Sequence, residues 1–141
     1  MGIDYGSVRI GISVSDETNT IAFGKDVFDN DKNCFPKITG IVKQNGIGKI
    51  ILGYPLNLKG NKSPQTLKVE EFEAKLRNFL DNSIGEGFVR IIRWDERFTS
   101  KMALDSMFES GMKKKKRQQK SNLDIISAAL LLQSYLDSMK K

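Results

Sequence analysis

The chain has 141 residues, with 23 basic and 17 acidic side chains, no histidine and one cysteine, Cys34. This composition excludes an internal disulfide, a cysteine-based zinc site and nucleophilic catalysis by a Ser-His or Cys-His pair. No apolar run of about 18 residues is present, and no basic N-terminal region precedes an apolar stretch. We therefore expect a single cytoplasmic domain over residues 1–141, in which acid–base or metal chemistry uses carboxylates, lysines or hydroxyls.

Residues 3–14 predict two short strands around a turn at Gly6-Ser7, and residues 21–28 predict a weaker third strand. In the second strand, apolar residues alternate strictly with Arg9, Gly11 and Ser13, which indicates that one face is buried. Asp4 interrupts the apolar pattern of the first strand. A carboxylate in that position is costly unless it has a partner, so it needs an explanation.

Residues 37–44 predict a helix, and KIIL at residues 49–52 predicts a strand buried on both faces. The sequence GYPLNLKGNKS at residues 53–63 is typical of a loop. Ser63-Pro64 then predicts the N-cap and first position of a second helix. Its expected core-facing stripe consists of Leu67, Val69, Phe72, Leu76, Phe79 and Leu80.

Residues 88–94 predict another strand, which ends at Asp95-Glu96. Thr99 is expected to cap a helix that reaches about Ser110, and residues 122–139 predict a final helix that Asp124 opens. Apolar residues recur four, seven, eight and eleven positions after Asp124, so Asp124 lies on the stripe that faces the sheet.

The order of elements predicts an α/β fold with a mixed five-stranded sheet and helices on both faces. Three antiparallel strands come first, and the later strands are separated by helices and need parallel crossovers. In such sheets, functional sites gather at the carboxyl ends of the parallel strands.

Three acids interrupt apolar patterns near that edge: Asp4, Glu96 and Asp124. Each also has a simpler explanation, since Asp4 could cap the following turn, Glu96 could pair with a neighbouring arginine, and Asp124 could favour a helix N-terminus. Three carboxylates at one edge would instead suggest divalent cations, above all Mg²⁺. Two such ions about 4 Å apart stabilise an in-line phosphoryl displacement.

The net charge of +6 lies entirely in GMKKKKRQQK at residues 111–120, which has six basic residues and no acid. Such a run can be a solvated loop, a localisation signal or a contact for a phosphate backbone. As contacts for nucleic acid we consider Lys113, Lys114, Lys115, Lys116 and Arg117.

Five segments in order resemble the YqgF/RuvX family over nearly the whole chain: IDYGSVRIGISVSD, GYPLNLKG, DERFTS, KKKKR and LDIISAALLLQSYL. Members are described as Holliday junction resolvases or as nucleases that mature the 5′ end of pre-16S ribosomal RNA. The resemblance implies a ribonuclease-H-like fold, with metal-binding acids at Asp4, Glu96 and Asp124 and with Mg²⁺, or Mn²⁺ in its place, as cofactor.

The chain departs from the family pattern in two places. Only three residues precede Asp4, so we expect the native first strand to extend upstream of Met1. Ribonuclease-H-like resolvases often have a fourth acid in the last helix, whereas serines occupy the positions three before and three after Asp124. A three-acid site is expected to bind its second metal ion weakly until nucleic acid supplies a phosphate ligand.

The sequence favours a Mg²⁺-dependent phosphodiesterase that acts on structured nucleic acid, RNA rather than DNA, with water as nucleophile. Arg9 and Arg97 are candidate phosphate contacts, although Arg9 could be an ordinary surface residue and Arg97 could hold Glu96. One alternative is a nucleic-acid or ribosome-assembly binding module without catalysis. Another is a junction resolvase, which needs a homodimer, whereas RNA trimming needs only a monomer. Phosphotransfer requires two such domains and is disfavoured by the chain length.

Overall fold

A computed structural model describes residues 1–98 and 120–140. It contains one five-stranded sheet, with the strands in the spatial order β3-β2-β1-β4-β5. The strands are β1 (Gly2–Tyr5), β2 (Arg9–Ser15), β3 (Ala22–Asp29), β4 (Lys49–Tyr54) and β5 (Arg90–Asp95). The pairs β1–β2 and β2–β3 are antiparallel, and β4 pairs in parallel with both β1 and β5. The predicted mixed sheet is therefore confirmed.

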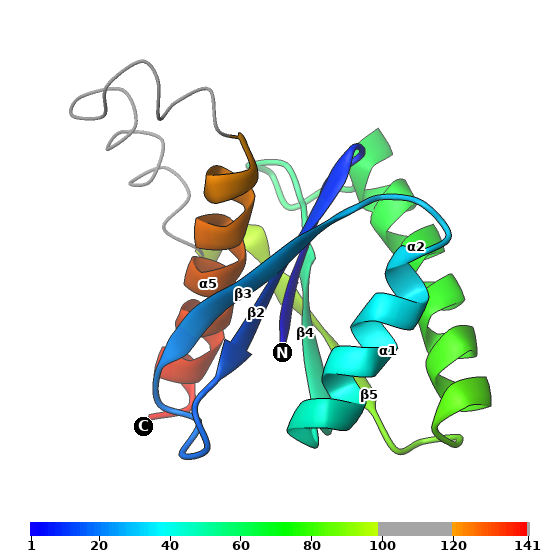
Figure 1. The fold of residues 1–141 in the computed structure, drawn as a ribbon. Helices are drawn as coiled ribbons and strands as arrows, with labels where there is room; N and C mark the ends of the chain where they lie inside the picture. Colours follow the sequence, from blue (N-terminus) through cyan, green and yellow to red (C-terminus); the bar gives the residue numbers. More distant parts are fainter. Residues whose placement is uncertain (99–119, 141) are drawn as a thin grey trace.

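Helices cover both faces of this sheet (Figure 1). Helices α1 (Cys34–Asn45) and α2 (Pro64–Ser83) lie on one face, and α5 (Lys120–Ser138) lies on the other. A short 3₁₀ helix, η1 (Glu96–Phe98), follows β5 directly. Within the described ranges, no helix has the length and apolarity needed to cross a membrane.

The two faces of the sheet bury separate apolar cores. Ile3 of β1 and Ile10 and Ile12 of β2 pack with α1 and α2, whereas Ile51 of β4 packs with Leu132 of α5. Because side chains alternate between the faces of a strand, this pattern turns the residues next to Ile3 toward α5. One of those neighbours is Asp4, so its carboxylate leaves the sheet on the α5 side.

Helix α2 begins where the sequence predicted. The Ser63 hydroxyl accepts a hydrogen bond from the backbone N–H of Thr66, and the Thr66 hydroxyl accepts one from the backbone N–H of Ser63, with Pro64 in the first turn. Such a reciprocal cap satisfies two backbone donors at the helix start. The prediction for Leu67 was wrong, because this side chain is exposed and Thr66 takes the buried position that begins the stripe. The Thr66 hydroxyl also donates to the Pro55 carbonyl, which fixes this rotation of the helix.

Several boundaries differ from the sequence expectations. Helix α1 begins at Cys34 rather than at residue 37, and β4 continues for two residues past Leu52. Strand β5 begins at Arg90 rather than at residue 88, and Phe88 is exposed. Helix α5 begins at Lys120, so Asp124 lies one turn inside the helix and does not open it. The helix expected at residues 99–110 lies outside the described residues.

Candidate active site

Asp4 stands between two glycines on the neighbouring strands. It lies opposite Gly11 of β2. In the β1–β4 pairing, Ile3 lies beside Leu52. Continued by one residue, this register places Asp4 beside Gly53 of β4. Neighbouring positions of adjacent strands project to the same face of a sheet, so all three face α5. The row therefore has one carboxylate at its centre and no side chain on either flank.

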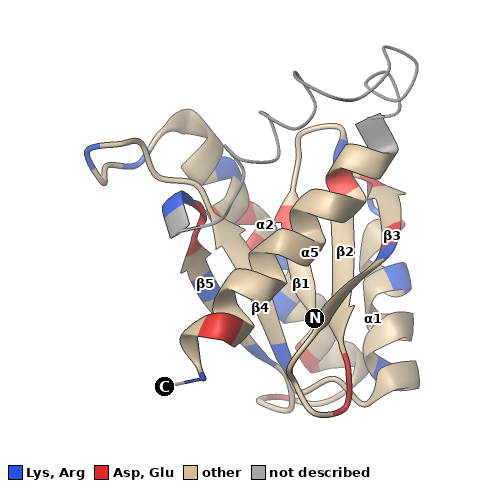
Figure 2. Ribbon diagram, turned by 90° about the vertical axis from the view of Figure 1, so that its left-hand side faces the viewer, with Lys and Arg blue, Asp and Glu red and all other residues tan. Residues whose placement is uncertain are grey.

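Helix α5 crosses the strands of the sheet diagonally (Figure 2), and its residues Asp124 and Ala128 lie against Gly11. A side chain at position 11 would overlap the backbone carbonyl of Asp124, so this close approach requires glycine. The Ser13 hydroxyl donates to the carbonyl of Ala128 at 2.7 Å, and Nε of Arg9 donates to Oδ2 of Asp124 at 2.9 Å. The non-apolar residues of β2 thus form the docking surface for the first half of α5.

Glu96 reaches the same face from the other side of Asp4. It is the first residue after β5, and its Oε1 lies where a side chain on Gly53 would stand. Glu96 thus lies above one flanking glycine, and the backbone of Asp124 lies above the other. The structure brings the three acids to one face and to the carboxyl ends of the central strands, where sites in such sheets gather.

The donor set suits a hard divalent cation, which prefers carboxylate oxygens. As the side chains stand, however, no group of three or more Asp, Glu or Cys residues within the described part of the chain is arranged to hold a metal ion. Asp124 is engaged by Arg9. The residue types therefore fit a metal and their arrangement does not yet form a ligand group, so the roles of the three acids as metal ligands stay a prediction.

Arg9 has a structural partner that the sequence analysis did not consider. Its side chain and that of Asp124 are 29% and 28% exposed, so the ion pair is largely shielded from water. The alternation in β2 would have indicated this partner. Arg9, Gly11 and Ser13 are two residues apart, so all three face the same side of the strand, which is the side that α5 covers. Arg9 therefore holds Asp124, whatever contact it makes with nucleic acid.

Arg97 is held in place by Asp95. Its Nε and Nη2 donate to Oδ2 of Asp95 at 2.8 and 2.6 Å, and its backbone N–H donates to Oδ1 at 2.9 Å. The hydrogen bonds from the Arg97 side chain, before any other cause, hold the pKa of Asp95 below its ordinary value, and they raise the pKa of Arg97. Arg97 is thus an oriented, permanently charged cation next to Glu96. Sequence reasoning had considered only Glu96 as its acidic partner.

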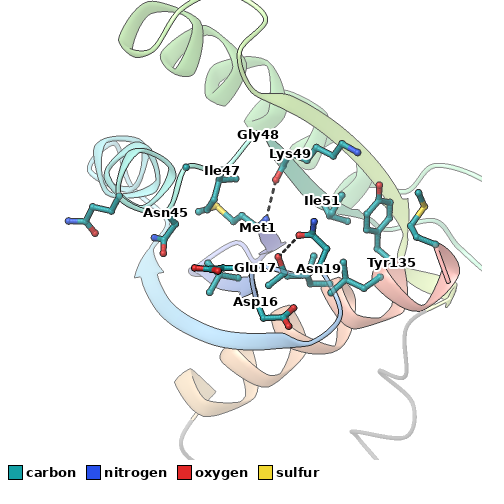
Figure 3. Close-up of a pocket in the computed structure, with 17 residues that line it drawn as sticks. Met1, Asp16, Glu17, Asn19, Asn45, Ile47, Gly48, Lys49, Ile51 and Tyr135 are labelled. Carbon is teal, nitrogen blue, oxygen red and sulfur yellow. Dashed lines mark hydrogen bonds between the residues drawn. The ribbon is translucent and has the colours of Figure 1, made fainter.

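A cavity of about 870 Å³ lies at the opposite ends of the strands (Figure 3). The residues around it include Asp16, Glu17 and Tyr135, and the Met1 amino group donates to the Lys49 carbonyl there at 3.1 Å. None of the three candidate acids lines this cavity. Its size therefore does not make it the candidate active site, because the chemistry-bearing residues gather at the other edge.

The remaining candidate contacts are the basic residues of the segment 111–120. Lys113, Lys114, Lys115, Lys116 and Arg117 lie outside the described residues. Their role in binding nucleic acid stays a prediction from the sequence.

Solved structures with the same fold include two resolvases. RuvC of T. thermophilus, in complex with a Holliday junction substrate, matches with a TM-score of 0.58 and 12% identity over 99% of this chain and 94% of that chain. The Fowlpox virus resolvase, in complex with Holliday junction DNA, matches with a TM-score of 0.51 and 18% identity over 99% and 97%. These likenesses confirm the expected ribonuclease-H-like fold.

Curated relatives match the chain from end to end. A protein of Ruminiclostridium cellulolyticum is 37% identical over 140 residues, which cover 97% of this chain and 92% of the relative. A protein of Amoebophilus asiaticus is 39% identical over 143 residues, which cover 100% and 95%. Both are named "Putative pre-16S rRNA nuclease". The family model described as "RuvX: Holliday junction resolvase" matches residues 1–138. The chain therefore belongs to the RuvX family, as its motifs indicated.

Proposed function

We propose that this chain is a divalent-metal-dependent nuclease, with Mg²⁺ as its natural ion, that removes extra nucleotides from the 5′ end of precursor 16S ribosomal RNA. The observation that carries the proposal is the row Gly11–Asp4–Gly53, with Asp124 above one glycine and Glu96 above the other. Divalent ions bound by such carboxylates lower the pKa of water and neutralise charge on a phosphate. Because Gly11 and Gly53 carry no side chains, the α5 backbone and Glu96 can approach Asp4 closely from its two sides.

The other residues of this edge contribute binding and orientation. Arg97, which Asp95 orients, supplies a fixed positive charge beside Glu96. Arg9 keeps Asp124 directed toward the sheet. Because no histidine exists in the chain, the base that accepts the proton of the attacking water must be a carboxylate or a metal-bound species. We assign the whole activity to a single domain, which acts as a monomer on RNA.

Two other functions have specific support. The family model is described as a Holliday junction resolvase, and the two solved neighbours reported above are in complex with Holliday junction substrates. Symmetric junction cleavage would require a homodimer, because two strands must be cut. A binding module without catalysis is favoured by the fact that no metal-holding acid group is preformed in the described residues.

The test uses the purified full-length chain with a 5′-extended 16S RNA fragment and a four-way DNA junction, each with Mg²⁺, with Mn²⁺ or with a chelator. We expect metal-dependent cleavage of the RNA. Asp4→Asn should abolish cleavage while binding persists or tightens, because the change removes a charge that repels phosphate and preserves the shape. Asp26→Asn is the matched control, since Asp26 is exposed on β3 and bonds only to the next backbone N–H in the described structure.

Each outcome discriminates between the three functions. Cleavage of the junction but not of the RNA would identify a resolvase. Binding of RNA without cleavage under either metal would identify a binding module. Equal loss of binding and cleavage in Asp4→Asn would show that Asp4 is structural, which would refute its role as a metal ligand.

A further inference from the structure

The loop between β4 and α2 contains a turn at residues 57–61 that is fixed by its own hydrogen bonds. The Asn57 side chain accepts from the backbone N–H groups of Lys59 and Asn61, at 3.0 and 2.9 Å. The backbone N–H of Asn57 donates to the Asn61 carbonyl at 3.0 Å, and that of Gly60 donates to the Asn57 carbonyl at 2.8 Å. Gly60 has a φ of +84°, a conformation that favours glycine. The turn is thus ordered before any partner binds.

Leu58 lies at the tip of this turn, and its side chain is 92% exposed. Among the large apolar side chains that the structure describes, it is the most exposed. Val8, which is 70% exposed, lies in the β1–β2 turn at the same carboxyl edge of the sheet. Single exposed apolar residues are common on protein surfaces. What distinguishes Leu58 is that an ordered turn holds it away from the body of the protein.

Two basic residues belong to this turn or contact it. Lys59 follows it directly, and the guanidinium of Arg97 lies against the turn, with Nη1 at 3.4 Å from the position of a Cβ on Gly60. Arg97 is the residue after Glu96, so the turn stands beside one of the three candidate acids. An apolar tip on a turn with cations beside it complements a nucleic acid, which has charged phosphates and apolar base faces.

We propose that Leu58 inserts between bases at an unstacked step of the bound nucleic acid, while Lys59 and Arg97 contact the flanking phosphates. This inference rests on the proposed action on nucleic acid and adds how the substrate is selected. Opening a base step costs least at a duplex end, a bulge or a branch point. Leu58 therefore favours substrates with such a discontinuity and sets it beside Glu96. Leu58 takes no part in the chemistry itself.

The experiment measures base unstacking directly. Two probes carry the fluorescent base 2-aminopurine next to the discontinuity: an RNA duplex with a single-stranded 5′ extension, and a four-way DNA junction. The parent protein is the full-length Asp4→Asn variant, so that no probe is cleaved. Its binding should increase the 2-aminopurine fluorescence, because insertion unstacks the base. The probe that gives the larger increase identifies the nucleic acid that the turn recognises.

Leu58→Ser in this background should lose the fluorescence increase and bind roughly tenfold more weakly, because burial of one leucine side chain is worth at least that factor. The slope of log affinity against log salt should stay the same, since no charge changes. Leu58→Met, which keeps an apolar tip, should retain the signal. Lys59→Ala should instead reduce the slope by up to about 0.9 and keep the signal. Phe88→Ser is the matched control, because this 72% exposed residue precedes β5, at the opposite end of the strands.

The outcomes separate this inference from the function on which it rests. If the parent binds a probe and Leu58→Ser matches it in affinity and fluorescence, the insertion is refuted, and the leucine serves a contact with another protein. If the parent binds without any increase in fluorescence, the insertion is refuted while nucleic-acid binding stands. If the parent binds neither probe, the proposed function and this inference fail together.

Discussion

The ion pair between Arg9 and Asp124 should be a measurable source of stability. Arg9→Gln removes the charge and leaves the Asp124 carboxylate against the sheet without its cation. Exposed pairs contribute about 0.2–1 kcal/mol, and hydrogen bonds to charged groups contribute about 1.5–3 kcal/mol. With side chains 29% and 28% exposed and a 2.9 Å contact, the pair lies between these cases. We therefore expect a loss of about 1–2 kcal/mol in the free energy of unfolding.

For a domain of this size, 1 kcal/mol corresponds to about 4 °C in Tm, so Arg9→Gln should melt roughly 4–8 °C lower at neutral pH. Thermal unfolding of the wild type, Arg9→Gln, Asp124→Asn and the double variant gives the coupling energy directly. Salt at 0.5 M should change this energy little, because largely shielded charges are weakly screened. The control is Lys75→Gln, which breaks an exposed pair with Glu71 of α2 and should cost less than about 0.5 kcal/mol. Additive single effects, within about 0.3 kcal/mol, would refute the pairing.

Three other changes have expected outcomes. Gly53→Ala should lower the cleavage rate at least tenfold with only a small change in Tm, because the added methyl group occupies the position of the Glu96 carboxylate; an unchanged rate in a turnover assay would show that this carboxylate is not needed. Alanine at Lys113, Lys114, Lys115 and Lys116 together should flatten the log–log salt dependence of RNA binding by up to about 3–4 units, and superimposable slopes would mean that these lysines do not contact phosphate. The pKa of Glu70 is lowered, first by its hydrogen bond from Lys62, and the pKa of Asp95 is lowered, first by its hydrogen bonds from Arg97. Each carboxylate therefore contributes its full stability above its ordinary pKa, which is 4.5 for Glu70 and 3.8 for Asp95. That contribution is lost as the pH falls through the lower pKa of the folded state. Melting curves between pH 7 and pH 3 test this, since Arg97→Gln should lose less stability over the acidic part of the range than the wild type does.

The sequence predicted the elements that depend on local physics. Ser63-Pro64 marked the start of α2, because a hydroxyl before a proline suits a helix N-terminus wherever that helix lies. Alternation in β2 identified the apolar face that packs against α1 and α2. It did not show that the other face is buried too, where small residues such as Gly11 and Ser13 are covered by α5. Leu67 was placed wrongly, because apolar character alone does not decide between two adjacent positions on a helix. Thr66 took the buried position through its hydroxyl contact with Pro55, which no periodicity contains.

Pairings between distant segments were harder to predict. Arg9 and Asp124 are 115 positions apart, and their contact depends on which part of α5 crosses β2. Arg97 had both Asp95 and Glu96 within reach in the sequence, and charge alone does not distinguish them. The backbone decides, because Asp95 also accepts the Arg97 N–H and so closes a compact hydrogen-bonded unit.

The docking of α5 onto the first strands has a consequence for biosynthesis. Position 2 faces Ala128 and Leu132, and position 11 faces Asp124. The first two strands therefore make contacts with α5 that can form only after α5 has been synthesised. On the ribosome, β1 and β2 emerge more than a hundred residues before α5, so the contacts that α5 makes with the sheet cannot form until those later residues have emerged. Contacts of such long sequence separation form slowly. A nascent chain therefore contains Asp4 before Asp124 has been made, so the three candidate acids come together only after α5 has docked on the sheet.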